Sequence, residues 1–139
     1  MDREMIGQKL ESLRRSVARV EEKCPDSLDA LKKDFDAQDI ITLNLSRAVQ
    51  MCVDIGAHLL ADSNQTAPGT MGSTFEMLCE AGIISDDLAG KLKKAVGFRN
   101  MAVHNYEAIN WAIVFAIATM HLQDFREFAE AVTFYLSMR

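Results

Sequence analysis

Apolar residues recur at steps of three and four along most of the chain, which is the period of amphipathic helices. The first stripe predicts a helix that runs to about Glu22, and Pro25 interrupts the pattern. A second helical tract is expected to begin near Ser27 and to continue, with or without a kink, into a longer helix. The three stripes are Ile6, Leu10, Leu13, Val17 and Val20; Leu28, Leu31 and Phe35; and Ile41, Leu45, Ala48, Cys52, Ile55 and Leu59.

Turn and cap signals divide the next part of the chain. Residues 62–72 collect turn-forming residues without apolar periodicity, which predicts a loop. The spacing from Ser73 to Glu76 is that of a capping box, so a short helix is expected to begin there and to end at Gly82. Ser85 is expected to cap the following helix. The buried side of that helix is predicted to carry Leu88, Leu92, Ala95 and Ala102.

The last part of the chain, residues 107–138, is nearly apolar and is predicted to form one long helix. No segment alternates in the manner of a strand, so the fold class is all-α. A chain of 139 residues fits a single domain over residues 1–139, as an up-and-down bundle of four main helices with one short extra helix. Residues 109–117 are apolar on more than one face, which favours a homodimer. The predicted stripe of the last helix is Val114, Ala118, His121, Phe125, Phe128, Val132 and Tyr135.

The charge balance narrows the classes of partner. A formal net charge of −5 disfavours a protein that coats nucleic acid through a broad positive surface, so any contact with RNA must be local. The basic residues are not evenly spread, and some of them form two clusters; a solvated helix face is the alternative explanation for each cluster. These clusters are Lys91, Lys93, Lys94 and Arg99, and Arg14, Arg15 and Arg19.

The cysteines and the apolar runs predict where in the cell the protein is found. Cys24, Cys52 and Cys79 are odd in number and far apart, which excludes a disulfide framework and a Cys-x-x-Cys site. A reducing cytoplasm is therefore expected. No signal peptide and no membrane span are expected, because the longest apolar run, residues 108–120, is too short to cross a bilayer.

One octapeptide carries a plausible set of chemical groups. Residues 99–106 read Arg-Asn-Met-Ala-Val-His-Asn-Tyr. Arg99 offers a permanently charged fork suited to a phosphate, His104 exchanges protons near neutral pH, and Tyr106 adds a hydroxyl. Together they suggest phosphodiester chemistry, in which a base activates the 2′-hydroxyl of RNA and a cation stabilises the charge on the phosphate. The same residue types also occur as surface groups and polar anchors.

Helix geometry places a condition on that chemistry. On one uninterrupted helix, Arg99 and His104 would point about 140° apart. Either the helix ends within the motif, so that His104 and Tyr106 fold back, or the working pairs form between two copies of the chain; both can hold together. Two copies would bring two histidines to one phosphate, one as base and one as acid.

The other histidines give weaker signals. His58 has Asp54 one turn earlier, but no third ligand stands at a useful spacing, so no metal site is expected. His121 lies on the predicted apolar stripe, where a core or interface position is expected. No cofactor is implied by any motif.

The string Gly97-Phe-Arg-Asn-Met-Ala-Val-His-Asn-Tyr106 resembles the signature of the HepT-like toxins of the HEPN superfamily, which is Arg, four residues, His, one residue, Tyr. Residues 43–55 resemble the second conserved helix of that family. The resemblance implies an all-α homodimer whose two motifs face a shared cleft and cut RNA without metal, leaving a cyclic phosphate. It also implies a partner, a small nucleotidyltransferase antitoxin of the MntA type that transfers AMP to Tyr106.

Residue roles follow from the same resemblance. It implies that Arg99 binds the phosphate, that His104 is the general acid and base, and that Tyr106 is the modified residue. Asn100 either contacts the motif backbone or the phosphate, or acts as a structural cap. Arg47 either reaches the cleft or forms an ion pair on the helix surface.

Two other functions remain open at this point. One is a non-catalytic HEPN subunit that presents a nucleotide or substrate to a nucleotidyltransferase, which needs Arg99 but not His104. The other is a purely structural helical dimer, which gives no reason to place Arg, His and Tyr together. The complete triplet favours the ribonuclease toxin.

Overall fold

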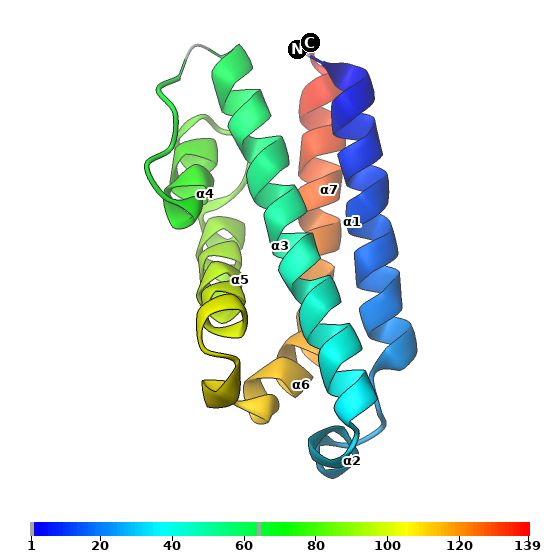
Figure 1. Cartoon of the computed structure of the whole chain (residues 1–139). Helices are drawn as coiled ribbons and strands as arrows, with labels where there is room; N and C mark the ends of the chain where they lie inside the picture. The colour runs from blue at the N-terminus through cyan, green and yellow to red at the C-terminus, as the bar shows by residue number, and fades with distance from the viewer. Residues whose placement is uncertain (1, 64) are drawn as a thin grey trace.

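The computed structural model describes residues 2–63 and 65–139, and these form helices without any strand. The all-α fold predicted from the sequence is therefore confirmed. Seven α-helices and one 3-10 turn succeed one another along the described residues (Figure 1). They are α1 (Arg3–Lys23), α2 (Leu28–Lys33), α3 (Phe35–Asp62), α4 (Met71–Glu80), α5 (Asp86–His104), η1 (Tyr106–Ala108), α6 (Trp111–Met120) and α7 (Leu122–Ser137).

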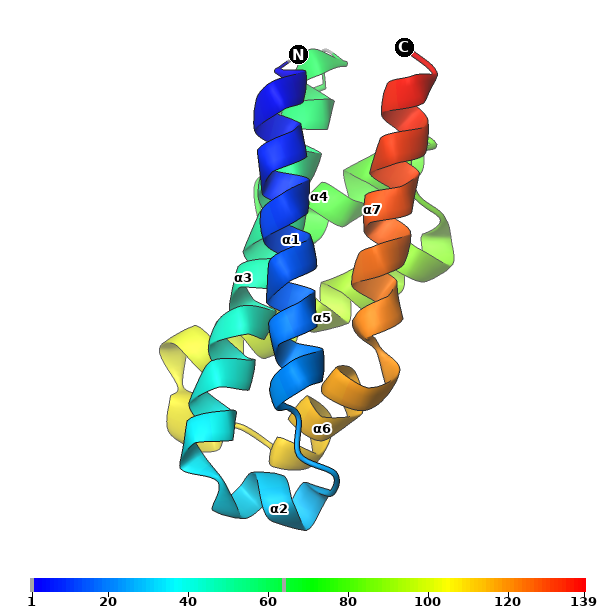
Figure 2. The same ribbon diagram turned by 90° about the vertical axis from the view of Figure 1, so that its right-hand side faces the viewer.

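The long helices form the body of a bundle. α1 lies along α3, α7 packs beside α1, and α5 packs against both α3 and α7 (Figures 1 and 2). The short helices α2 and α6 meet at one end, and both chain ends lie at the other. There, Arg3 Nη1 donates to the carbonyl oxygen of Leu136 at 3.1 Å. The bundle of four main helices is thus α1, α3, α5 and α7.

The predicted apolar stripes form the core. Every residue of the stripe from Ile41 to Leu59 is buried, and Cys52 is a small core residue among them. Burying one large aliphatic side chain contributes about 1.5–3 kcal/mol, so this stripe alone anchors α3 firmly. Phe35 was expected on a buried stripe, but its side chain is 73% exposed. That expectation was wrong because α2 and α3 are separate helices.

Caps explain the breaks near both ends of α3. Asp34 Oδ1 accepts a hydrogen bond from the backbone N–H of Ala37 at 3.0 Å and starts a new helix, so the second tract does not run on. The predicted loop follows α3, although residue 64 lies outside the described residues. The capping box is formed by Thr70 and Ser73, three residues earlier than predicted. Gly82 ends this region as expected, with a φ of 77°.

The prediction of a single long helix over residues 107–138 is wrong, because η1, α6 and α7 occupy this range. Asn110 Oδ1 accepts from the backbone N–H of Ala112 at 2.9 Å and begins α6, and the helix breaks again at His121 before α7. The side chain of His121 is exposed rather than buried, and its Nδ1 lies 3.3 Å from Asp124 Oδ2. The apolar periodicity continues across this break, so the pattern did not predict it.

Gly56 lets α4 pack closely on α3. A Cβ at this position would lie 2.7 Å from Thr74 Cγ2 and 2.8 Å from Leu78 Cδ1. We expect Gly56→Ala to lower the free energy of unfolding by about 1–3 kcal/mol, because the core must shift to admit the methyl group. Gly90→Ala is the control, since no atom lies within 4 Å of its Cβ, and it should stabilise the protein slightly. Urea denaturation followed by circular dichroism measures both; equal midpoints would contradict the prediction.

Candidate active site

The motif occupies the end of α5 and the turn that follows it. Ser85 Oγ accepts from the backbone N–H of Leu88 at 3.1 Å to begin α5, and the helix ends at His104. Asn105 is the cap, and its backbone N–H donates to the carbonyl of Met101 at 2.8 Å. The helix therefore ends within the motif, but only after His104. Arg99 and His104 remain on one helix, about 140° apart around its axis.

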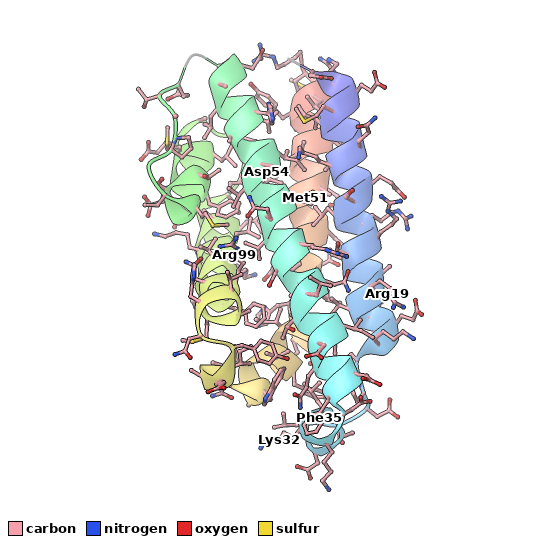
Figure 3. The ribbon with its side chains drawn as sticks, viewed as in Figure 1. Arg19, Lys32, Phe35, Met51, Asp54 and Arg99 are labelled. Atoms are coloured by element: carbon pink, nitrogen blue, oxygen red, sulfur yellow. The ribbon has the colours of Figure 1, made fainter. Side chains whose placement is uncertain are left out.

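Arg99 extends from α5 toward α3 (Figure 3). Its Nη2 donates to Gln50 Oε1 at 3.3 Å, and its Nη1 donates to Asn100 Oδ1 at 3.3 Å. Both acceptors are neutral, and among the described residues no carboxylate forms an ion pair with Arg99. The guanidinium is oriented while its charge stays available, which is the condition for binding an incoming phosphate.

A series of polar contacts through Asp54 and Lys9 fixes the side chain of Gln50. Gln50 Nε2 donates to Asp54 Oδ1 at 2.8 Å, and Lys9 Nζ of α1 lies 3.3 Å from Asp54 Oδ2. The Lys9 charge offsets that of Asp54, so the carboxylate orients Gln50 without being aimed at Arg99. Sequence reasoning missed Gln50 and Lys9 as partners of the motif. The available signal was the spacing of Gln50 and Asp54, which puts both on one face of α3.

Tyr106 is tied to the same helix. Its hydroxyl donates to Asp39 Oδ1 at 2.8 Å, and its ring packs edge-on against Trp111 with centroids 6.0 Å apart. Burial raises the pKa of Tyr106, the hydrogen bond to Asp39 raises it further, and a hydrogen bond with Thr42 lowers it. The hydroxyl is thus neutral at physiological pH and held by a carboxylate. Sequence analysis did not identify Asp39 as the partner of Tyr106.

His104 stands apart from these contacts. It is the last residue of α5 and is exposed, and its side chain makes no hydrogen bond or ion pair with any residue of the described ranges. Arg99 and Tyr106 both turn to α3, whereas the imidazole remains free. Within one chain, Arg99, His104 and Tyr106 therefore do not converge on a common binding position.

The structure also decides between the alternatives for the contacts of Asn100 and Arg47. Asn100 accepts a hydrogen bond from Arg99, whereas the cap is Asn105. Arg47 is exposed on α3 and, among residues 2–63 and 65–139, has no acidic partner. The helix-surface ion pair considered for Arg47 is therefore not formed.

Metal clusters and membrane-spanning helices are both absent from the described part of the chain. No group of three His, Cys, Asp or Glu side chains there is placed to hold a metal ion, and His58 is exposed. Nor does any described helix have the length and apolar character needed to span a bilayer.

Comparison with known proteins connects this geometry to a family. The family model described as "Ribonuclease HepT-like" matches residues 13–132. The chain belongs to the ribonuclease HepT-like family. The HepT-like chain is 33% identical over 129 residues to the mRNA nuclease HepT of Shewanella oneidensis, covering 93% of the chain and 96% of that relative. It is 29% identical over 113 residues to the tRNA nuclease HepT of Aphanizomenon flos-aquae, covering 79% of the chain and 75% of that relative.

Solved structures agree with the sequence relatives. The HepT-like fold superposes with a TM-score of 0.89 on a tri-AMPylated HEPN toxin of Shewanella oneidensis in complex with an MNT antitoxin, at 32% identity over 96% of this chain and 98% of the other. A toxin–antitoxin structure with AMP-PNP gives the same TM-score and identity, over 94% of this chain and 98% of the other. The HepT-like resemblance inferred from residues 97–106 and 43–55 is confirmed.

Proposed function

We propose that this protein is the toxin of a toxin–antitoxin pair and an endoribonuclease that cuts RNA without a metal ion. The observation that carries the proposal is the state of Arg99, which neutral groups orient and no described carboxylate neutralises. It lies in the same motif as the free imidazole of His104. Membership of the ribonuclease HepT-like family supports an RNA substrate.

The chemistry follows from these two side chains. One imidazole takes the proton of the 2′-hydroxyl, and the oxygen attacks the adjacent phosphorus. The bond from phosphorus to the 5′-oxygen breaks, and a second, protonated imidazole supplies the proton to that leaving oxygen. The products are a 2′,3′-cyclic phosphate and a free 5′-hydroxyl. Arg99 stabilises the charge that develops on the phosphate oxygens.

A homodimer supplies what one chain lacks. Arg99 and His104 diverge around the α5 axis, and one imidazole cannot be base and acid in the same step. A two-fold axis near the end of α5 would bring two copies of the motif to one phosphate. We propose that this shared cleft is the active site and that AMP transfer to Tyr106, by a nucleotidyltransferase antitoxin, closes it.

A second candidate function uses the same geometry differently. A single chain presents Arg99 as an anion site while His104 makes no contact, which suits a subunit that binds a nucleotide and leaves chemistry to a nucleotidyltransferase. This binding subunit needs Arg99 and does not need His104. Cleavage assays separate the two functions.

The test is RNA cleavage by the purified protein in EDTA. We expect cleavage with cyclic phosphate ends, identified by mass spectrometry of the fragments. Arg99→Ala should lower the rate about 10²–10³-fold, the usual effect of removing one donor that stabilises a developing anion. Arg126→Ala is the matched control, because it removes an arginine that pairs with Glu21 on α1. Cleavage only with added metal would contradict the mechanism, and nucleotide binding without cleavage would establish the second candidate.

A further inference from the structure

A basic hollow lies between α1 and α3, beside the candidate active site. Its volume is about 430 Å³, and three arginines contribute to its walls together with two hydroxyls and an amide. These residues are Arg15, Arg19, Arg47, Ser12, Ser16 and Asn44, which we call the α1–α3 groove. Guanidinium, hydroxyl and amide groups are those that contact phosphates and sugars in nucleic-acid complexes.

The arginines of the α1–α3 groove are poorly neutralised. Within the described ranges Arg47 has no acidic partner, and Arg15 forms no ion pair and donates one side-chain hydrogen bond, to Ser12 Oγ at 3.4 Å. Arg19 lies 3.3 Å from Glu22, but both side chains are largely exposed, and such pairs contribute little. Local positive charge therefore persists on a chain whose net charge is −5.

The neighbouring acidic side chains are engaged elsewhere. Glu11 forms its ion pair with Arg14, one residue before Arg15 on a different face of α1. Asp54 of α3 is paired with Lys9 and hydrogen-bonded to Gln50. Both carboxylates are thus already paired with a cation outside the groove, which leaves the groove arginines available to an incoming anion.

The groove and Arg99 belong to one face of the molecule. Arg47 precedes Gln50 by three residues on α3, so both lie on the same exposed side of that helix. Gln50 holds Arg99, and Arg47 lines the groove. Figure 3 shows Arg99 on one side of α3 and Arg19 on the other, with Met51, which also lines the groove, between them. An RNA strand with one phosphate at Arg99 could therefore cross α3 and reach the groove beside α1.

We propose that the α1–α3 groove binds the phosphates of single-stranded RNA that flank the bond cut at Arg99. This inference rests on the proposed function. Arginine forks suit successive phosphates, and the serine hydroxyls suit phosphate or 2′-hydroxyl oxygens. An acidic protein surface would also meet the positive charge, but continuity with the Arg99 phosphate site favours one polyanionic strand that spans both.

The test compares RNA binding by two triple variants in a His104→Ala background, which prevents cleavage. The first carries Arg15→Ala, Arg19→Ala and Arg47→Ala. The control removes the same charge elsewhere, through Arg14→Ala, Lys32→Ala and Lys33→Ala, all exposed and outside the groove. Fluorescence anisotropy with a labelled single-stranded RNA oligonucleotide gives the affinity over a series of salt concentrations.

The groove variant should bind more weakly, and the slope of log affinity against log salt should fall by about 2, since each phosphate contact on a single strand contributes about 0.7. The control variant should keep the parent slope. Equal slopes would overturn the proposal, as would a loss confined to antitoxin binding or a change in oligomeric state caused only by the groove variant. Wild-type cleavage of the same RNA separates the inferences: no cleavage refutes the proposed function, whereas cleavage with equal slopes refutes the groove alone.

Discussion

A dimer with His104→Ala in only one of its two chains is expected to lose nearly all RNA cleavage, as completely as a dimer with the substitution in both. Arg99 and His104 diverge on α5, and the proposed reaction uses one imidazole as base and another as acid at the same phosphate. If both histidines serve one bond, a single intact copy is insufficient. General acid or base catalysis contributes about 10²–10⁴-fold, which sets the expected loss.

The mixed dimer is obtained by co-expressing wild-type and His104→Ala chains with different tags and purifying through both tags. Its cleavage rate is compared with that of wild-type dimers at equal protein concentration. Mixed dimers with His58→Ala are the control, because His58 is exposed on α3 and outside the motif. Half of the wild-type rate would show two independent sites and refute the shared site; a full rate would remove His104 from catalysis.

Most of the fold could be predicted because its signals are local. The stripe from Ile41 to Leu59 is buried at every position, since an amphipathic helix records its buried face in its own periodicity. The breaks in the last third of the chain could not be predicted in this way. Neither proline nor glycine marks His121, and the apolar period passes through it into α7. Only the packing of α6 across the end of the bundle requires the change of direction (Figure 2).

In the candidate site, too, local signals could be predicted from the sequence and long-range contacts could not. The motif made Arg99, His104 and Tyr106 candidates because their spacing is a local property. Their partners come from α3: Gln50 is 49 residues from Arg99 in the sequence, and Asp39 is 67 residues from Tyr106. Such contacts depend on how α5 and η1 dock against α3. No local pattern encodes that docking, although the helical spacing of Asp39, Gln50 and Asp54 marks a polar stripe opposite the core.

Asp39→Asn is expected to slow AMP transfer to Tyr106 about 10²–10⁴-fold, the usual contribution of a positioned general base. In that transfer the Tyr106 oxygen attacks the α-phosphorus of a nucleoside triphosphate, pyrophosphate leaves, and the phenolic proton must be removed. Asp39 already accepts the hydrogen bond from this hydroxyl at 2.8 Å, so its carboxylate is placed to take the proton. Asparagine can still accept the hydrogen bond but cannot take the proton.

The measurement is mass spectrometry of AMP on Tyr106 after timed incubation with the nucleotidyltransferase partner and nucleoside triphosphate. Tyr106→Phe should accept no AMP at this position while it retains RNA cleavage, and Asp39→Glu should restore part of the transfer rate. A merely structural role for Asp39 would leave the pH profile unchanged. Loss of the base should instead make transfer by Asp39→Asn rise steadily with pH, because burial raises the pKa of Tyr106 and the phenolate must then form without help. A profile parallel to that of the wild type would show that Asp39 only positions the ring.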